Sequence, residues 1–468
     1  MKDTKGNNYQ EIENNIIKKM QDVYEQYTYL INSNRLREDE KQLFQKHLRG
    51  EINKADLQDS LHFLSKLLHK HFQQTVYILI DEYDEVINSS YVKFGQESEE
   101  FESIIDLIRG TLGSALKQNQ YLEKGVLTGV FRIAKASLFS GLNNVAEYSL
   151  LDKRFSEYYG FTQDEVDDLL TNKVPDIVDQ NDIKNWYNGY VFGGQIVYNP
   201  LSIMHCLSEG GILDNYWVDS GDPSLIDQAM LSDDNQIELQ TLLHGKSVTK
   251  RIYKQIAFDQ IKENKDLFYS LLVFTGYLNP IPIEFELGIY KLSIPSNQEV
   301  RKIYEDRVIQ WVTRKLNIST SDYDNFVSLL LEEKMERFGE KLKHYLLNST
   351  STFDLTEEKD YHNLMGGILS PLSRKYLVES NKESGYGRYD HVLVPKSNNP
   401  NNTAFILEYK VCKKENQLEN KAKLGLEQIE KKLYDTQIKQ NPQTKRIVKT
   451  CLSFWKKKVV MRHREEEI

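Results

Sequence analysis

The sequence predicts an α/β protein with more than one domain. An uninterrupted apolar run at residues 76–80 (VYILI) ends in the acidic segment DEYD, as a buried parallel strand with functional groups at its carboxyl end would. A helical segment and a second short apolar stretch follow, and the last quarter of the chain again alternates helices with short strands. The 468 residues suffice for two or three domains with sizeable cores.

The first part of the chain begins with helices. Apolar residues recur at helical spacing between residues 9 and 72. We then expect the strand at 76–80, a helix at 101–118 and a second strand at 125–130, which together indicate α/β architecture. From about 160 to 345 the pattern is mostly helical, with apolar stripes along several segments.

The polar stretch at 346–360 marks a domain boundary. We therefore predict three parts: an α/β domain at residues 1–220, a helical region at 221–345 and a final domain at 346–468. The elements expected in the final domain are a helix at 361–372, strands at 375–380, 388–394 and 404–411, a helix at 420–435 and strands at 447–453 and 457–462.

Composition excludes some classes of protein. No stretch approaches 18 consecutive apolar residues, so no membrane span is expected. The polar start is not followed by an apolar signal core, so secretion is not expected. Cys206, Cys412 and Cys451 are far apart and form no CxxC pair, which favours a reducing cytoplasm.

Charge is unevenly distributed along the chain. The net charge of −9 argues against a protein coated in basic surface for nucleic acid. Residues 411–468, however, hold 15 Lys and Arg against 8 Asp and Glu. This basic stretch could meet phosphates, or it could simply be a solvated lysine-rich helix face.

Two carboxylates and a lysine interrupt the apolar strands of the final domain. In the strand at 404–411 (AFILEYKV), alternation places Glu408 and Lys410 on one face and apolar side chains on the other. The hairpin that precedes this strand would bring Asp390 beside Glu408. Two carboxylates on neighbouring strands can hold Mg²⁺, which takes few protein oxygens and can activate a water near a phosphate. A nearby lysine can orient or deprotonate that water, or stabilise the developing charge.

The Glu-x-Lys triplet alone is weak support for such a site. It also occurs at 332–334, 357–359 and 430–432, in polar contexts. Only the copy at 408–410 lies in an apolar strand, and an ordinary surface Glu–Lys pair beside an unrelated Asp remains the alternative.

The segments GYGRYDHVLVP and AFILEYK resemble the motif of the PD-(D/E)XK nuclease superfamily. The resemblance implies an αβββαβ core, Mg²⁺ or Mn²⁺ held by Asp390 and Glu408, and Lys410 in the catalytic position. It also implies that a glutamine and a tyrosine on the following helix lie near the substrate, and Gln428 and Tyr434 match these places. A helical histidine sometimes assists the metal in that superfamily; His362 is the candidate here, although it is more often a packed or solvated helix residue.

The strand at 76–80 has the form of a Walker B strand. In an ATPase, Asp81 would hold Mg²⁺ and Glu82 would polarise the attacking water, with Thr128 and Arg132 near the γ-phosphate. The alternative is a buried strand followed by a solvated acidic turn. The sequence holds no G-x-x-x-x-G-K-[ST] loop ahead of this strand, and the G-K-S at 245–247 comes too late and lacks the first glycine, so we interpret it as a decoy.

Several dispersed segments resemble a family that joins an AAA-ATPase-like domain to a C-terminal PD-(D/E)XK domain. They are DEYDEVIN, LTGVFRIAKASLFSGLNN, FSEYYGFTQDEV, WYNGY and LLVFTGYL. The resemblance implies a fold of the α/β class with an incomplete, P-loop-like parallel sheet, a helical region and a nuclease-like domain. Because its relatives carry a Walker A-like loop, we expect that this chain is truncated at its N-terminus and that ATP binds weakly or not at all.

Two functions follow from these observations. The first is a magnesium-dependent nuclease acting on DNA or RNA, in which Asp390, Glu408, Lys410 and Gln428 form the site. The alternative is a non-catalytic nucleic-acid-binding or protein-interaction module with a decayed ATPase half, and a third reading is a decaying chain with no stable fold. The expected partner is nucleic acid, with no membrane.

Overall fold

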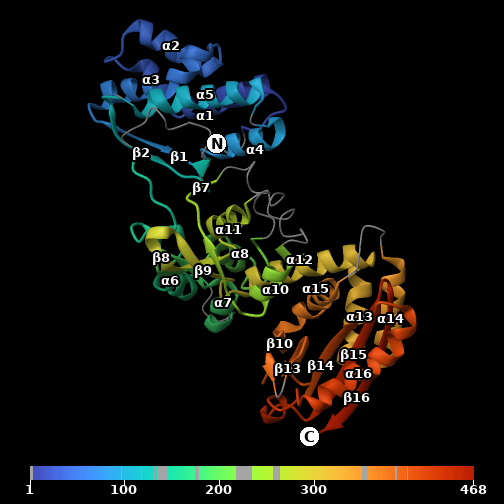
Figure 1. The fold of residues 1–468 in the computed structure, drawn as a ribbon. Coiled ribbons are helices and arrows are strands. Elements are labelled where there is room, and N and C mark those ends of the chain that lie inside the picture. The colour runs from blue at the N-terminus through green and yellow to red at the C-terminus, as the bar shows by residue number, and fades with distance from the viewer. Residues whose placement is uncertain are drawn as a thin grey trace. The chain divides into compact units, whose positions relative to one another are not determined.

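The chain is described by a computed structural model (Figure 1). It describes residues 4–95, 97–117, 119–130, 132–133, 145–173, 179–217, 235–256, 264–349, 357–384, 387–397 and 399–468. The chain forms two compact units: unit 1 is Met1–Ser149 with Ile252–Thr275, and unit 2 is Leu150–Arg251 with Gly276–Ile468. Both units mix helices and strands, which confirms the predicted α/β class. The three-part division of the chain stays a prediction.

Unit 1 packs helices against a small parallel sheet. Its elements are α1 (Tyr9–Glu25), α2 (Glu38–Arg49), α3 (Lys54–Phe72), β1 (Val76–Ile80), α4 (Glu85–Phe94), α5 (Glu99–Leu116), β2 (Leu122–Leu127), β3 (Arg132–Ile133), β7 (Gln255–Ile256) and α11 (Lys265–Phe274). Asn8, Asn53 and Ser98 cap α1, α3 and α5, because each side chain accepts a hydrogen bond from the backbone three residues on. Strand β1 pairs in parallel with β2, and β3 with β7. The strand predicted at 76–80 is confirmed, whereas the next strand begins three residues earlier than predicted.

The first part of unit 2 is less helical than predicted. Its elements are α6 (Gln163–Lys173), α7 (Gln180–Tyr187), β4 (Tyr190–Phe192), β5 (Gln195–Val197), α8 (Pro200–Ser208), α10 (Gln236–Leu243), β6 (Val248–Arg251), β8 (Asn279–Glu284), β9 (Ile289–Ser293), α12 (Gln298–Leu316), α13 (Thr320–Leu331) and α14 (Met335–Asn348). The hairpin β4–β5 and the three-stranded sheet β6-β9-β8 were not predicted. Strand β8 lies at the edge of its sheet and contains Pro280 and Pro282. Proline has no N–H to donate to the neighbouring strand, so the sequence pattern does not indicate a strand here.

The last part of unit 2 has the expected αβββαβ order, with the short hairpin β11–β12 and the strand β16 in addition. Its elements are α15 (Glu358–Leu369), β10 (Tyr376–Ser380), β11 (Glu383–Ser384), β12 (Gly387–Arg388), β13 (His391–Pro395), β14 (Thr403–Val411), α16 (Leu418–Lys431), β15 (Arg446–Trp455) and β16 (Lys458–Glu467). Five of the strands form a sheet in the order β10-β13-β14-β15-β16. Only the pair β14–β15 is parallel, and α16 makes that crossover.

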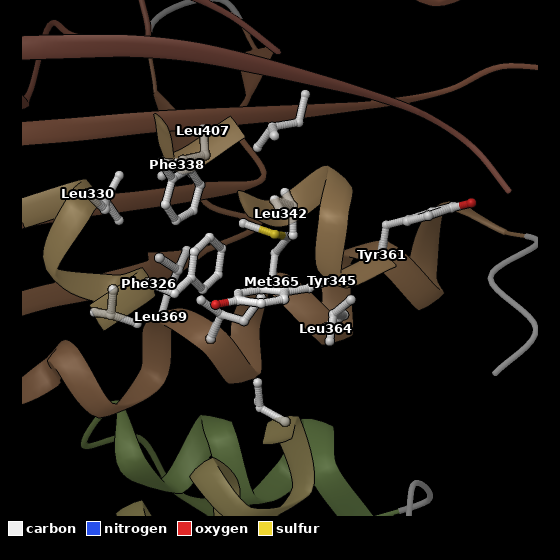
Figure 2. Packing of buried hydrophobic residues seen from close by; sticks show 14 of the residues in the cluster. Phe326, Leu330, Phe338, Leu342, Tyr345, Tyr361, Leu364, Met365, Leu369 and Leu407 are labelled. Atoms are coloured by element: carbon white, nitrogen blue, oxygen red, sulfur yellow. The ribbon is translucent and has the colours of Figure 1, made fainter. Parts of the chain in front are cut away.

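The five-stranded sheet is covered on both faces. On one face, Phe405, Leu407 and Tyr409 of β14 join a large core with side chains of α13, α14 and α15, part of which Figure 2 shows. On the other face, Ala404 and Ile406 pack in a smaller core with Ile429 of α16. The alternation predicted for β14 is therefore confirmed, and the face that carries Glu408 and Lys410 is the face beneath α16.

Candidate active site

Asp390 and Glu408 lie at the same end of two neighbouring strands. His391, the first residue of β13, is opposite Leu407 of β14 in the antiparallel register, so the preceding residue, Asp390, lies alongside Glu408. The backbone N–H of Tyr409 donates a hydrogen bond of 2.6 Å to Asp390 Oδ2. This bond ties the Asp390 carboxylate to the strand between Glu408 and Lys410.

One oxygen of Glu408 is fully engaged, and the other is not. Glu408 Oε1 accepts hydrogen bonds from Lys410 Nζ at 2.6 Å and from Gln428 Nε2 at 2.7 Å. Glu408 Oε2 is buried and has no hydrogen-bond partner among the described residues. A buried carboxylate oxygen without a partner costs free energy, so this atom is poised to accept a ligand.

Gly425 allows α16 to approach the strands that carry Lys410 and Cys451 closely. A Cβ atom at this position would lie 2.2 Å from Cys451 Sγ and 3.4 Å from Lys410 Cγ. The missing side chain therefore lets the helix rest on the Lys410 stem, and Gln428, one turn further along the helix, reaches Glu408.

The electrostatic environment disfavours negative charge on both carboxylates. Burial and the nearby Glu408 carboxylate raise the pKa of Asp390 to about 7. Burial also raises the pKa of Glu408, although Lys410 and Gln428 oppose the shift. For Lys410, burial lowers the pKa, but the hydrogen bond and charge of Glu408 outweigh burial, so its pKa is raised overall. Lys410 therefore stays protonated at neutral pH.

Glu358, in the first turn of α15, is an acidic neighbour that sequence reasoning missed. Its charge contributes to raising the pKa of Asp390 and of Glu408, so it adds to the negative charge around both carboxylates. The sequence signal was obscured because Glu358 lies inside the Glu-x-Lys copy at 357–359, which looked like a solvated helix start.

Gln428 lies on α16, as the resemblance implies, whereas Tyr434 lies three residues beyond the end of that helix. Gln428 Nε2 donates to Glu408 Oε1 and also lies 3.0 Å from Tyr434 Oη. Burial raises the pKa of Tyr434, so its hydroxyl stays protonated at neutral pH. Tyr434 and Gln428 thus form a short chain of hydrogen bonds to the buried carboxylate of Glu408.

His362 lies beside the backbone of Asp390. Its Nε2 is 3.3 Å from the Asp390 carbonyl oxygen, and Asn381 Nδ2 is 3.1 Å from the same nitrogen. The ring also packs on His391, with ring centroids 4.3 Å apart. In this arrangement His362 contacts the carbonyl of Asp390 and not its carboxylate.

The donor set fits a hard divalent cation. No group of three or more His, Cys, Asp or Glu is placed to hold a metal in the described part of the chain. Mg²⁺ does not require such a group, because it commonly binds through one or two carboxylates and keeps several waters. Asp390 and Glu408 supply hard oxygens, and a cation would neutralise the negative charge that burial disfavours on both.

The N-terminal carboxylates stand in a different setting. Asp81 is exposed at the end of β1, and its Oδ1 accepts a hydrogen bond from the Thr128 hydroxyl. Glu82 adopts a left-handed backbone conformation (φ 51°). The structure thus brings Thr128 to Asp81, while the side chain of Arg132 lies outside the described residues; the Walker B role of these residues stays a prediction.

Asp84 is the buried acid of the DEYD segment, and sequence reasoning gave it no role. Its Oδ2 accepts hydrogen bonds from Val130 N at 3.0 Å and from Asn88 Nδ2 at 3.2 Å. A Cβ on Gly129 would lie 2.5 Å from Asp84 Oδ1. Asp84 therefore holds the turn after β2 against the start of α4.

The G-K-S tripeptide at 245–247 lies between the end of α10 and β6. A phosphate-binding loop needs the N–H groups at a helix N-terminus, and here the helix presents its carbonyl end. The interpretation of this tripeptide as a decoy is confirmed.

The last part of unit 2 combines the αβββαβ order with two carboxylates side by side on neighbouring strands. Residues 356–464 match the model of the PD-(D/E)XK nuclease superfamily, and residues 1–139 match the model described as predicted AAA-ATPase. The chain therefore carries an AAA-ATPase-like domain and a PD-(D/E)XK nuclease superfamily domain, in that order.

One curated relative is similar to part of the chain. It is described as an uncharacterized protein in the vnfD 5′ region of Azotobacter chroococcum mcd 1 and is 32% identical over 153 residues, which are 33% of this chain and 28% of the relative. The match thus spans less than a third of either protein. No solved structure matches the chain. In the described part of the chain, no helix combines the length and apolar character needed to cross a bilayer.

Proposed function

We propose that the C-terminal domain is a nuclease that hydrolyses phosphodiester bonds in DNA or RNA with Mg²⁺ or Mn²⁺. The observation that supports it is the buried, unpartnered Oε2 of Glu408 beside Asp390, with Lys410 on the other carboxylate oxygen. The family match of residues 356–464 supports the same reaction class. The three cysteines, Cys206, Cys412 and Cys451, are free and buried, which favours the cytoplasm as its location.

Asp390 and Glu408 would hold the cation, together with the backbone carbonyl near Tyr409. When bound, such a cation supplies an activated water and stabilises charge on the phosphate. The protonated Lys410 orients the attacking water and stabilises negative charge on the phosphate oxygens, because its raised pKa disfavours a role as a base. Gln428 fixes the orientation of the Glu408 carboxylate through its 2.7 Å hydrogen bond.

The N-terminal carboxylates have a vestigial role in this proposal. Asp81, Glu82, Thr128 and Arg132 would be remnants of a nucleotide site that lacks a phosphate-binding loop in this sequence. Titration calorimetry with Mg-ATP is expected to show no saturable site at micromolar concentration. Such a site would contradict this part of the proposal.

The test is cleavage of plasmid and oligonucleotide substrates with Mg²⁺ or Mn²⁺. Lys410→Ala is expected to lower the cleavage rate by roughly 10²–10³-fold, the usual loss when one group that stabilises developing charge is removed. Lys334→Ala is the matched control, because Lys334 belongs to another Glu-x-Lys copy and pairs with Glu332 at 2.6 Å on the surface. Equal rates for the wild type and Lys410→Ala would refute the assignment.

A further inference from the structure

Helix α16 presents two differently charged flanks on either side of its buried stripe. Leu418, Ala422, Gly425 and Ile429 form that stripe against the sheet. On the flank toward β16, Glu419 Oε2 accepts from Arg462 at 2.8 Å and Glu430 pairs with Arg464. The two glutamates on this flank, the β16 flank, are thus paired within the domain.

The opposite flank, the catalytic flank, faces Glu408 through Gln428. Lys421 lies two turns before Gln428, Leu424 one turn before it and Lys432 one turn after it, so the four side chains follow one line along the helix. Both lysines are exposed, and neither has an ion-pair partner among the described residues. This flank therefore carries uncompensated positive charge beside the candidate active site.

An electrostatic effect of Lys421 and a short separation at Lys432 associate the two lysines with the strands around the candidate site. The Lys421 ammonium opposes the rise that burial causes in the pKa of the Cys412 thiol, and Cys412 is two residues beyond Lys410. Lys432 Cδ lies 3.4 Å from where a Cβ on Gly387 would be, on the hairpin strand that leads to Asp390. The two cations thus bracket the end of β14 that bears Glu408 and Lys410.

Leu433, the residue after Lys432, has a costly backbone conformation. It has φ 53° at the end of α16, where its N–H donates to the Glu430 carbonyl and the N–H of Tyr434 to the Ile429 carbonyl. Glycine is the usual residue at such a helix end, because a side chain is strained there. The leucine side chain is nevertheless 46% exposed, so its burial in this domain does not offset the strain. An exposed apolar side chain held at a backbone cost beside Tyr434 suggests contact with a ligand.

We propose that the catalytic flank of α16 is a binding track for a single-stranded polynucleotide. Lys421 and Lys432 contact successive backbone phosphates, and Leu424 and Leu433 contact the faces of unstacked bases on either side of Gln428. The inference rests on the proposed nuclease function and names its substrate class. Charge complementarity argues for this occupant, because cations in line with exposed apolar side chains match the alternating phosphates and bases of a single strand.

The first test measures binding of a fluorescein-labelled single-stranded oligonucleotide by anisotropy in EDTA, at several salt concentrations. Lys421→Ala and Lys432→Ala should each reduce the slope of log affinity against log salt by about 0.7, the value for one phosphate contact on a single strand. Lys423→Ala is the matched control, since Lys423 is exposed on the β16 flank of the same helix. Unchanged slopes in the first two variants, an equal loss in the control, or no binding by the wild type would overturn the track.

The second test uses Leu433→Gly. Glycine adopts φ 53° without strain, so the melting temperature should be unchanged or higher. Affinity for the single strand should nonetheless fall about tenfold, the value of one buried leucine side chain, while affinity for a blunt duplex stays within about twofold. Gln73→Gly repeats the same backbone change at the end of α3 in unit 1 and should leave affinity unchanged. Wild-type affinity of Leu433→Gly for the single strand, or an equal loss on the duplex, would overturn the role of Leu433.

Cleavage of the same oligonucleotide with Mg²⁺ separates the two proposals. Wild-type cleavage with no effect of the Lys421 and Lys432 changes would refute the track and leave the nuclease standing. Binding with the expected lysine pattern, but no cleavage by the wild type, would refute the nuclease and retain the track as a binding site.

Discussion

Two regions of this chain carry carboxylates at or near the end of a strand, and the surroundings of the two sets differ. At the end of β1, Asp81 is exposed to solvent and receives a hydroxyl from Thr128. At the ends of β13 and β14, Asp390 and Glu408 lie side by side beneath α16, and Glu408 is only 3% exposed. The same residue types thus stand in high dielectric in one unit and in low dielectric in the other.

The difference teaches where chemistry can be expected. A solvated carboxylate costs the fold little and can be lost or kept without consequence. A buried carboxylate with an unpartnered oxygen is costly, and such costs persist where the group is used. The comparison favours the C-terminal pair as the working site, even though the N-terminal segment has the more familiar sequence pattern.

The largest expected effect is on the cleavage rate, and it tests directly whether the C-terminal carboxylates act and the N-terminal ones do not. Asp390→Asn and Glu408→Gln should each lower Mg²⁺-dependent cleavage by about a thousandfold or more, because each removes a charge from a water-poor centre. Asp81→Asn and Glu82→Gln should leave the cleavage rate within about twofold, as for surface changes away from a site. The rates are measured on one plasmid substrate under single-turnover conditions.

This four-variant set has clear contrary outcomes. If the N-terminal variants lose as much activity as the C-terminal ones, the two regions act together and the contrast is wrong. If all four match the wild type, the cleavage comes from elsewhere. Circular dichroism of each variant guards against loss of fold.

The sequence predicted the elements that carry the site, because local patterns determine them. The run at 76–80 is a strand since five β-prone residues lie in succession, and β14 could be assigned to faces since its apolar residues alternate with Glu408 and Lys410. The strands β4 to β9 escaped prediction. They are short, and β8 is interrupted by prolines that only an edge strand accommodates.

The parts of the site that could not be predicted depend on tertiary packing. Whether Gln428 reaches Glu408 Oε1 depends on how closely α16 approaches the sheet, which Gly425 permits where it meets Cys451. The charge of Glu358 reaches Asp390 across a gap in sequence of more than thirty residues. Neither fact leaves a periodic or motif signal in the chain.

Burial should also make the stability of the protein depend on pH through His244, a residue outside the candidate site. Burial, helped by the charges of Lys246 and Arg301, lowers the pKa of His244 from 6.5 to about 4, and its Nε2 lies 3.0 Å from Ser370 Oγ. In the unfolded chain, His244 binds a proton more tightly than it does in the folded protein. The free energy of unfolding is therefore highest above pH 6.5 and decreases as pH falls toward 4. The loss should be about 3 kcal/mol.

The check is the urea midpoint between pH 7 and pH 4. His244→Gln should flatten the pH dependence relative to the wild type, since glutamine keeps a donor for Ser370 but does not titrate. His344→Gln, a change at an exposed histidine in the same unit, should retain the wild-type slope. Parallel curves for the wild type and His244→Gln would contradict the effect of burial.

The smallest expected effect tests whether α16, through Gln428, orients the buried carboxylate of Glu408. Gln428→Ala should lower cleavage by roughly 10–100-fold, the usual cost of removing a group that orients a metal-binding residue, and should raise the Mg²⁺ concentration needed for half-maximal rate. Glu427→Ala, the neighbouring change on the same helix, should alter neither quantity. A purely structural role for Gln428 would instead lower the melting temperature without moving the Mg²⁺ requirement. The Mg²⁺ dependence therefore decides between two roles for the bond from Gln428 to Glu408: it fixes the position of the helix, or it orients the carboxylate for the cation. Only the second role is a functional difference between these buried carboxylates and the solvated ones at the end of β1.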